Sequence, residues 1–191
     1  MATKLKLLLR AQPLALVLKA VIFAALLTLV KIGNFNPILI LFFLAAALAL
    51  YHPPLAKSAT YLVSFSVLIF LSLLIVFRLA DTSLWLIFIV AAAFLFYLLL
   101  GLKSFFFIYR EQWHYLLQLS LFYLIFLIFF SADQANYSFW EGPGAFLINF
   151  LLWRELLKSI PGNSHPSLVA GISALLIAEI LWAVSFLPLG V

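Results

Sequence analysis

The sequence has no cysteine and few charged residues. Without cysteine, the chain has no disulfide bonds, thiolate metal sites, cysteine-bound iron–sulfur clusters or cysteine nucleophiles. Charged residues make up 9% of its 191 positions, against about 25% in an ordinary soluble domain. So few charges are too few to cover the surface of a water-soluble protein of this length.

Most residues of the chain are apolar instead. The chain is 68% hydrophobic and 17% aromatic, and a disordered chain has the opposite composition. The surplus apolar surface needs lipid as its solvent, and a helix satisfies its own backbone hydrogen bonds there. The composition therefore predicts an all-α, polytopic transmembrane helix bundle, formed by residues 1–191 as a single domain.

Seven apolar segments are candidates for membrane spans, because a spanning helix needs about 20 residues. The predicted spans are residues 13–30, 37–51, 58–77, 83–102, 113–130, 143–157 and 167–187. Segments 37–51 and 143–157 are short, reaching roughly 22 Å at 1.5 Å per residue. Six spans plus a re-entrant segment at 143–157 therefore remain an alternative.

Prolines mark several of the predicted helix starts. Pro13, Pro37, Pro143 and Pro166 lie at or just before them, and the first turn of a helix tolerates the missing N–H of proline. The first apolar segment contains Lys19 and is longer than the apolar region of a signal peptide, about 7–15 residues. It is predicted to be an uncleaved first span.

The distribution of basic residues predicts the orientation of the spans. The net charge is +5, from 11 Lys and Arg against 6 Asp and Glu, and basic residues prefer cytoplasmic loops. If the N-terminus is cytoplasmic and the C-terminus is outside, the outside loops contain only two basic residues, Lys31 and Arg78. The basic residues inside are then Lys4, Lys6, Arg10, Lys57, Lys103, Arg110, Arg154 and Lys158. They stand apart rather than in one patch, so no nucleic-acid partner is predicted.

Glu179 is the first candidate for an intramembrane polar site, because an ionisable group at membrane depth costs several kcal/mol. It lies near the middle of span 167–187. It would serve as a proton or cation relay, as a polar contact for a substrate, or as a neutral acid bonded to a neighbouring helix. Ala170, Ala174 and Ala178 form a line of small residues beside it. We expect that line to pack closely against protein, with Glu179 pointing the same way.

Three further polar residues fall inside predicted spans. Lys19 is expected to extend its side chain back to the membrane surface, and Gln118 lies at a similar depth. Asn149 is a candidate to meet Glu179 across a helix pair.

Residues 154–165 form the densest polar region of the chain. Arg154, Lys158 and His165 are candidate contacts for an anionic lipid headgroup. The alternative is that Arg154 and Lys158 only set the orientation of the protein in the membrane.

No sequence motif indicates a catalytic set, a metal site or a cofactor. The first hypothesis is a small non-enzymatic membrane subunit or assembly partner, in contact with membrane lipids and other membrane subunits. A transporter or permease component, with Glu179, Asn149 and Lys19 lining its path, is the alternative. A lipid-modifying enzyme using Arg154, Glu155, Lys158 and His165 is the second alternative. Compact loops and the lack of cysteine favour a prokaryotic plasma membrane.

Overall fold

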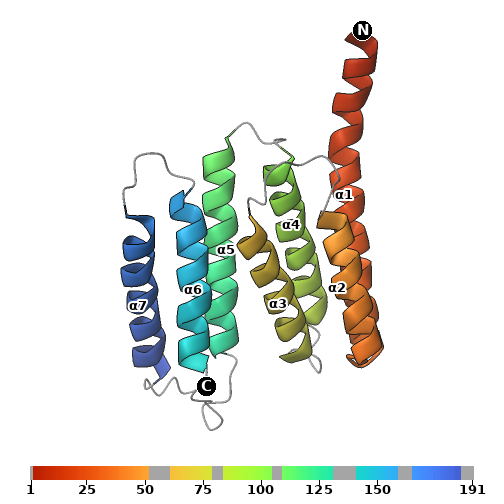
Figure 1. The fold of residues 1–191 in the computed structure, drawn as a ribbon. Helices are drawn as coiled ribbons and strands as arrows, with labels where there is room; N and C mark the ends of the chain where they lie inside the picture. Colours follow the sequence, from red (N-terminus) through yellow and green to blue (C-terminus); the bar gives the residue numbers. More distant parts are fainter. Residues whose placement is uncertain are drawn as a thin grey trace. The chain divides into compact units, whose positions relative to one another are not determined.

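The computed structural model describes residues 2–51, 61–78, 84–104, 109–130, 141–158 and 165–185. These residues form seven α-helices and no strand (Figure 1), which confirms the all-α prediction. Within them, Pro13–Ile32 and Trp85–Lys103 are long and apolar enough to cross a membrane. The helices are α1 (Ala2–Ile32), α2 (Pro37–Tyr51), α3 (Leu62–Arg78), α4 (Trp85–Lys103), α5 (Arg110–Phe130), α6 (Glu141–Lys158) and α7 (Pro166–Ser185).

Most helix boundaries lie close to the predicted ones, but the start of α1 does not. Pro37 and Pro166 open α2 and α7, as their position before an apolar run predicts. Pro13 instead lies inside α1, which begins at Ala2. The prediction that Pro13 starts the helix was wrong, because an interior proline costs a hydrogen bond without always ending a helix. Lys57, residues 58–60, residues 131–140 and residues 186–187 lie outside the described residues.

The turn between α1 and α2 is tight. Asn34 and Phe35 have φ angles of 50° and 56°, and Asn36 Oδ1 accepts a hydrogen bond from the backbone N–H of Ile38 at 3.0 Å. Asn36 therefore caps α2, and Pro37 follows where its missing N–H costs nothing. A Cβ on Gly33 would collide with the side chain of Leu39, so glycine permits this close approach.

The chain divides into two compact units, Met1–Leu117 (unit 1) and Gln118–Val191 (unit 2). In unit 1, α1 packs against α2, α3 and α4, and α3 packs against α4. Aromatic rings connect these helices. Phe96 stacks on Phe23 with centroids 4.4 Å apart, and Phe23 contacts Phe43 at 5.3 Å. Phe65 links Phe96 to Tyr51, at 6.4 and 4.1 Å.

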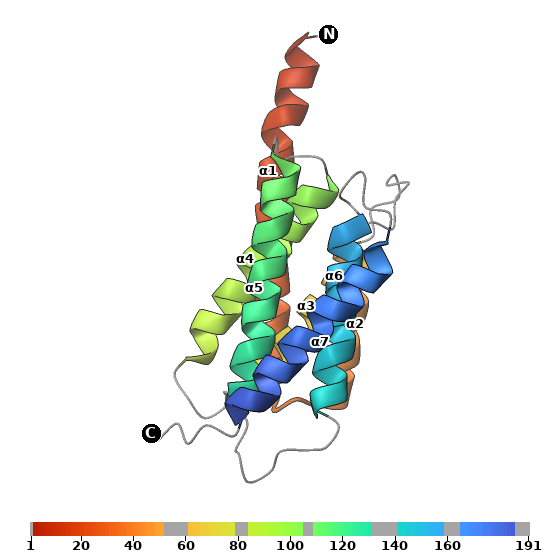
Figure 2. The same ribbon diagram turned by 90° about the vertical axis from the view of Figure 1, so that its left-hand side faces the viewer.

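Unit 2 is built on the close packing of α6 against α7, which lie side by side in Figure 1 and cross at an angle in Figure 2. Ala170 and Ala174 of α7 are fully buried. A Cβ on Gly171 would lie 4.0 Å from the ring of Phe150 on α6. The small side chains of α7 thus let the two backbones approach, as the alanine spacing predicts.

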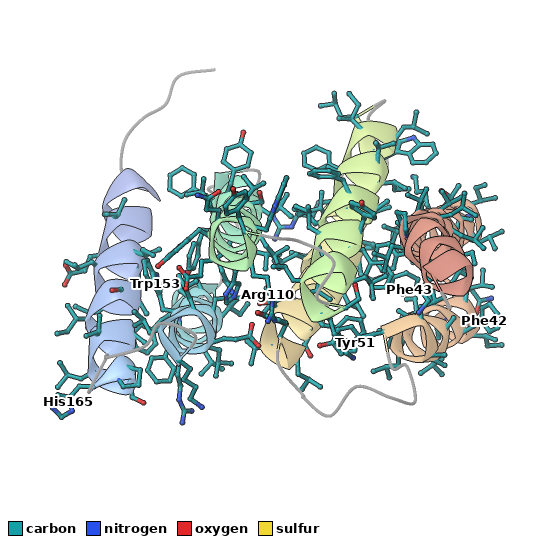
Figure 3. All side chains as sticks on the ribbon, turned by 90° about the horizontal axis from the view of Figure 1, so that it is seen from above. Phe42, Phe43, Tyr51, Arg110, Trp153 and His165 are labelled. Atoms are coloured by element: carbon teal, nitrogen blue, oxygen red, sulfur yellow. The ribbon has the colours of Figure 1, made fainter. Side chains whose placement is uncertain are left out.

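Large apolar side chains also cover the outside of the helices. Phe43 is buried while its neighbour Phe42 is exposed, and Figure 3 shows the two on different sides of α2. In α1, Leu14, Leu18 and Val21 are exposed as well. Helices that are apolar on both faces are typical of a lipid environment.

Candidate functional site

Two lysines from different helices meet at the C-terminal end of α2 in unit 1. Lys19 Nζ of α1 donates a hydrogen bond to the carbonyl of Leu50 at 3.1 Å. Lys103 Nζ of α4 donates to the carbonyl of Tyr51 at 2.7 Å. The last carbonyls of a helix lack partners within it and carry partial negative charge. Because α2 has no basic residue in its own last turn, α1 and α4 supply the cations.

The side chain of Tyr51 makes a second contact with Lys103. The Lys103 ammonium lies 3.6 Å from the centroid of the Tyr51 ring, which is a cation–π contact. The ring of Phe65 also stacks on the Tyr51 ring, with centroids 4.1 Å apart. The lysine is thus fixed by a ring that is itself packed in the core of unit 1.

Arg110 adds a third cation at the same end of unit 1, where α4 ends and α5 begins (Figure 1). Arg110 Nη2 donates to the Tyr61 hydroxyl oxygen at 3.3 Å. His114, one turn further along α5, is buried and meets the Tyr61 ring edge-on at 4.8 Å. Figure 3 looks down on this end and labels Tyr51 and Arg110. Lys19, Lys103, Arg110 and Tyr61 are called the basic cluster below.

Sequence reasoning found only part of this cluster. It singled out Lys19 and expected its ammonium near the membrane surface; the structure places that ammonium on the carbonyl of Leu50. The similar depth of Lys19 and Gln118 in the membrane stays a prediction. Lys103 and Arg110 entered the sequence argument only as orientation signals, and Tyr61 was missed. A basic residue at the end of an apolar run marks its side of the membrane, but its partners depend on helix packing.

Unit 2 holds the buried polar residues Gln118 and Asn149. Asn149 Nδ2 donates to the carbonyl of Ala145 at 2.8 Å, within its own helix. Its Oδ1 atom and Trp153 Nε1, one turn further on, are buried and form no hydrogen bond with the described residues. The Trp153 ring stacks on Phe122 of α5 at 5.4 Å. These polar atoms therefore lie on the helix face that α6 turns toward α5.

Glu179 lies elsewhere on the surface of unit 2. Its side chain is exposed, whereas Ala170 and Ala174 are buried against α6. The expectation that Glu179 points the same way as the alanines was wrong. Glu179 follows Ala170 by nine residues, about two and a half turns, so it lies on the opposite side of α7. With Asn149 buried and Glu179 exposed, unit 2 does not bring this predicted pair together.

The predicted headgroup contacts between residues 154 and 165 are also exposed. Arg154, Lys158 and His165 all have solvent-accessible side chains, and the backbone carbonyl of His165 accepts the N–H of Val169. Nothing in the described part of the chain gathers three His, Asp or Glu side chains in an arrangement that would hold a metal ion.

No protein-family model, no curated protein and no solved structure matches this chain.

Proposed function

We propose that the chain is a multi-pass integral membrane protein with a non-catalytic role, and that α7 docks a helix of another membrane subunit. All seven helices cross the bilayer, with the N-terminus in the cytoplasm and the C-terminus outside. The exposed apolar faces of α1, α2 and α4 support the membrane location. The observation that carries the docking role is the position of Glu179.

Glu179 is a single acid in an otherwise apolar, outward-facing surface. The exposed apolar residues of α7 around it are Leu168, Ile172, Leu175, Leu176 and Ile180. If α7 spans the bilayer, Glu179 lies about 20 Å from its start and about 9 Å from its end. A carboxyl group facing hydrocarbon at that depth needs a hydrogen-bonding or cationic partner. A helix of a second subunit with a donor or a basic side chain supplies it.

The orientation is tested by labelling single cysteines, since the natural chain has none. Lys57→Cys and Ser138→Cys place a thiol in a predicted inside loop and a predicted outside loop. A membrane-impermeant maleimide added to intact cells is expected to label Ser138→Cys only, and to label Lys57→Cys after lysis. Equal labelling of both positions in intact cells contradicts the proposed span count. Release of the wild-type chain by alkaline carbonate contradicts the membrane location itself.

The docking role is tested with a photoreactive residue at position 176, on the Glu179 face of α7. We expect a crosslink to another membrane protein, weakened about tenfold in Glu179→Leu and retained in Glu179→Gln. A hydrogen bond inside a membrane contributes about 1–2 kcal/mol in model peptides, and each 1.4 kcal/mol is tenfold. The matched control is Glu111→Leu, which removes an exposed carboxylate of α5 and leaves the crosslink unchanged.

Each other product of this experiment contradicts the docking role. Crosslinks to lipid alone mean that no subunit covers α7. A product of twice the chain mass means that a second copy covers it. A crosslink of equal strength in Glu179→Leu means that the carboxyl group does not bind the partner.

A further inference from the structure

The two lysine ammonium groups of the basic cluster converge. Lys19 and Lys103 bind the carbonyls of consecutive residues, Leu50 and Tyr51, at 3.1 and 2.7 Å. Their ammonium groups are therefore close together, and the charge of Lys19 acts on that of Lys103. Flexible lysines at the end of a bundle separate to reach water unless something favours their meeting. The carbonyls of α2 attract them but carry only partial charges.

The described part of unit 1 offers these cations no buried acid. Its one acidic residue is Glu111, and the side chain of Glu111 is exposed. Lys19 and Lys103 are half-buried, so solvent screens the repulsion between them only in part. An anion bound among them removes that repulsion.

The cluster also offers hydrogen-bond donors. An ammonium group has three N–H donors, and each lysine uses one on a carbonyl of α2. Two donors on each lysine are thus directed away from those carbonyls. The Tyr61 hydroxyl and Arg110 lie at the same end of unit 1, because Tyr61 precedes by one turn the Phe65 ring that stacks on Tyr51. The converging ammonium donors of Lys19 and Lys103 match the oxygens of a phosphate group.

We propose that Lys19 and Lys103 of the basic cluster bind a phosphate group, carried by the headgroup of an anionic lipid. The lipid source rests on the membrane location proposed above, whereas the phosphate site in unit 1 does not. The phosphate lies beside the middle of α1 and the C-terminal ends of α2 and α4, on the predicted cytoplasmic side. This site is separate from the exposed Arg154, Lys158 and His165.

The test is retention of lipid by the purified full chain. The protein is reconstituted in nanodiscs of equal phosphatidylglycerol and phosphatidylcholine, extracted in mild detergent, and its bound lipid is measured by native mass spectrometry. Wild type is expected to retain phosphatidylglycerol selectively. Lys19→Met/Lys103→Met is expected to retain about tenfold less phosphatidylglycerol, because each lysine near an anionic lipid contributes to the free energy of lipid binding. The matched control Lys31→Met/Arg78→Met removes two positive charges elsewhere in unit 1 and is expected to retain phosphatidylglycerol as wild type does.

Two further measurements separate the possible causes. Lys19→Arg/Lys103→Arg keeps both positive charges and is expected to retain phosphatidylglycerol. If this variant loses the lipid and its Tm falls, the lysines have a purely structural role and the proposal is overturned. Inorganic phosphate is added to the lipid-free wild type in detergent. A rise in Tm from phosphate, absent in the double Met variant, with no selective lipid retention, assigns the site to free phosphate. Equal retention of both lipids by wild type, with no effect of phosphate, overturns the site altogether, whatever the outcome for α7.

Discussion

Replacing Phe96 with alanine is expected to lower the free energy of unfolding by roughly 3 kcal/mol, near the lower end for a buried phenylalanine. Phe96 has 0% of its surface exposed. It joins three helices, because it stacks on Phe23 of α1 at 4.4 Å and contacts Phe65 of α3 at 6.4 Å. Losing the ring leaves a cavity between these three helices, and a helix packed against neighbours cannot shift to fill it without breaking other contacts.

The matched control for Phe96 is Phe94, two residues earlier in α4 and 53% exposed. Phe94→Ala removes the same ring from the exposed side of the helix, where no packed core is lost, so stability is expected to stay within about 0.5 kcal/mol. The measurement is thermal or denaturant unfolding in detergent, followed by tryptophan fluorescence. Equal losses for the two variants would show that the packing of α1, α3 and α4 around Phe96 does not stabilise unit 1.

Enlarging Ala174 is the second change with a large expected effect. Ala174 is fully buried in α7, which packs along α6. Ala174→Phe places a ring where there is room for a methyl group, and overpacking a core typically costs about 1–3 kcal/mol. A whole ring at a helix contact is expected to reach at least the upper end of that range, because the backbones of α6 and α7 must separate to admit it.

Leu175→Phe is the control for Ala174→Phe. The same side chain enters the same helix one position later, where Leu175 is 51% exposed. The expected result is a normal Tm for Leu175→Phe and a lowered Tm for Ala174→Phe, with faster amide exchange in α6 and α7 in the second variant only. A normal Tm for Ala174→Phe would contradict the close packing of α6 and α7.

The sequence by itself determined the helical class and most of the helix boundaries. In long apolar segments, a helix is the structure that satisfies the backbone hydrogen bonds within the segment itself. Pro37 and Pro166 fixed the starts of α2 and α7. The alanine spacing of α7 predicted its close packing, which Ala170 and Ala174 confirm. These features are local, so residues near one another in the chain specify them.

Only the tertiary structure decided which polar residues meet. Lys19 and Lys103 are 84 positions apart (103 − 19) in the sequence, yet they bind neighbouring carbonyls of α2. Their meeting depends on the packing of α1, α2 and α4, which composition and spacing do not encode. The helix that carries Glu179 was predicted, but the direction of the Glu179 side chain was not. Glu179 is exposed because Ala170 and Ala174, on the opposite side of α7, are buried against α6. Periodicity defines the faces of a helix, but the neighbouring helices decide which face is buried.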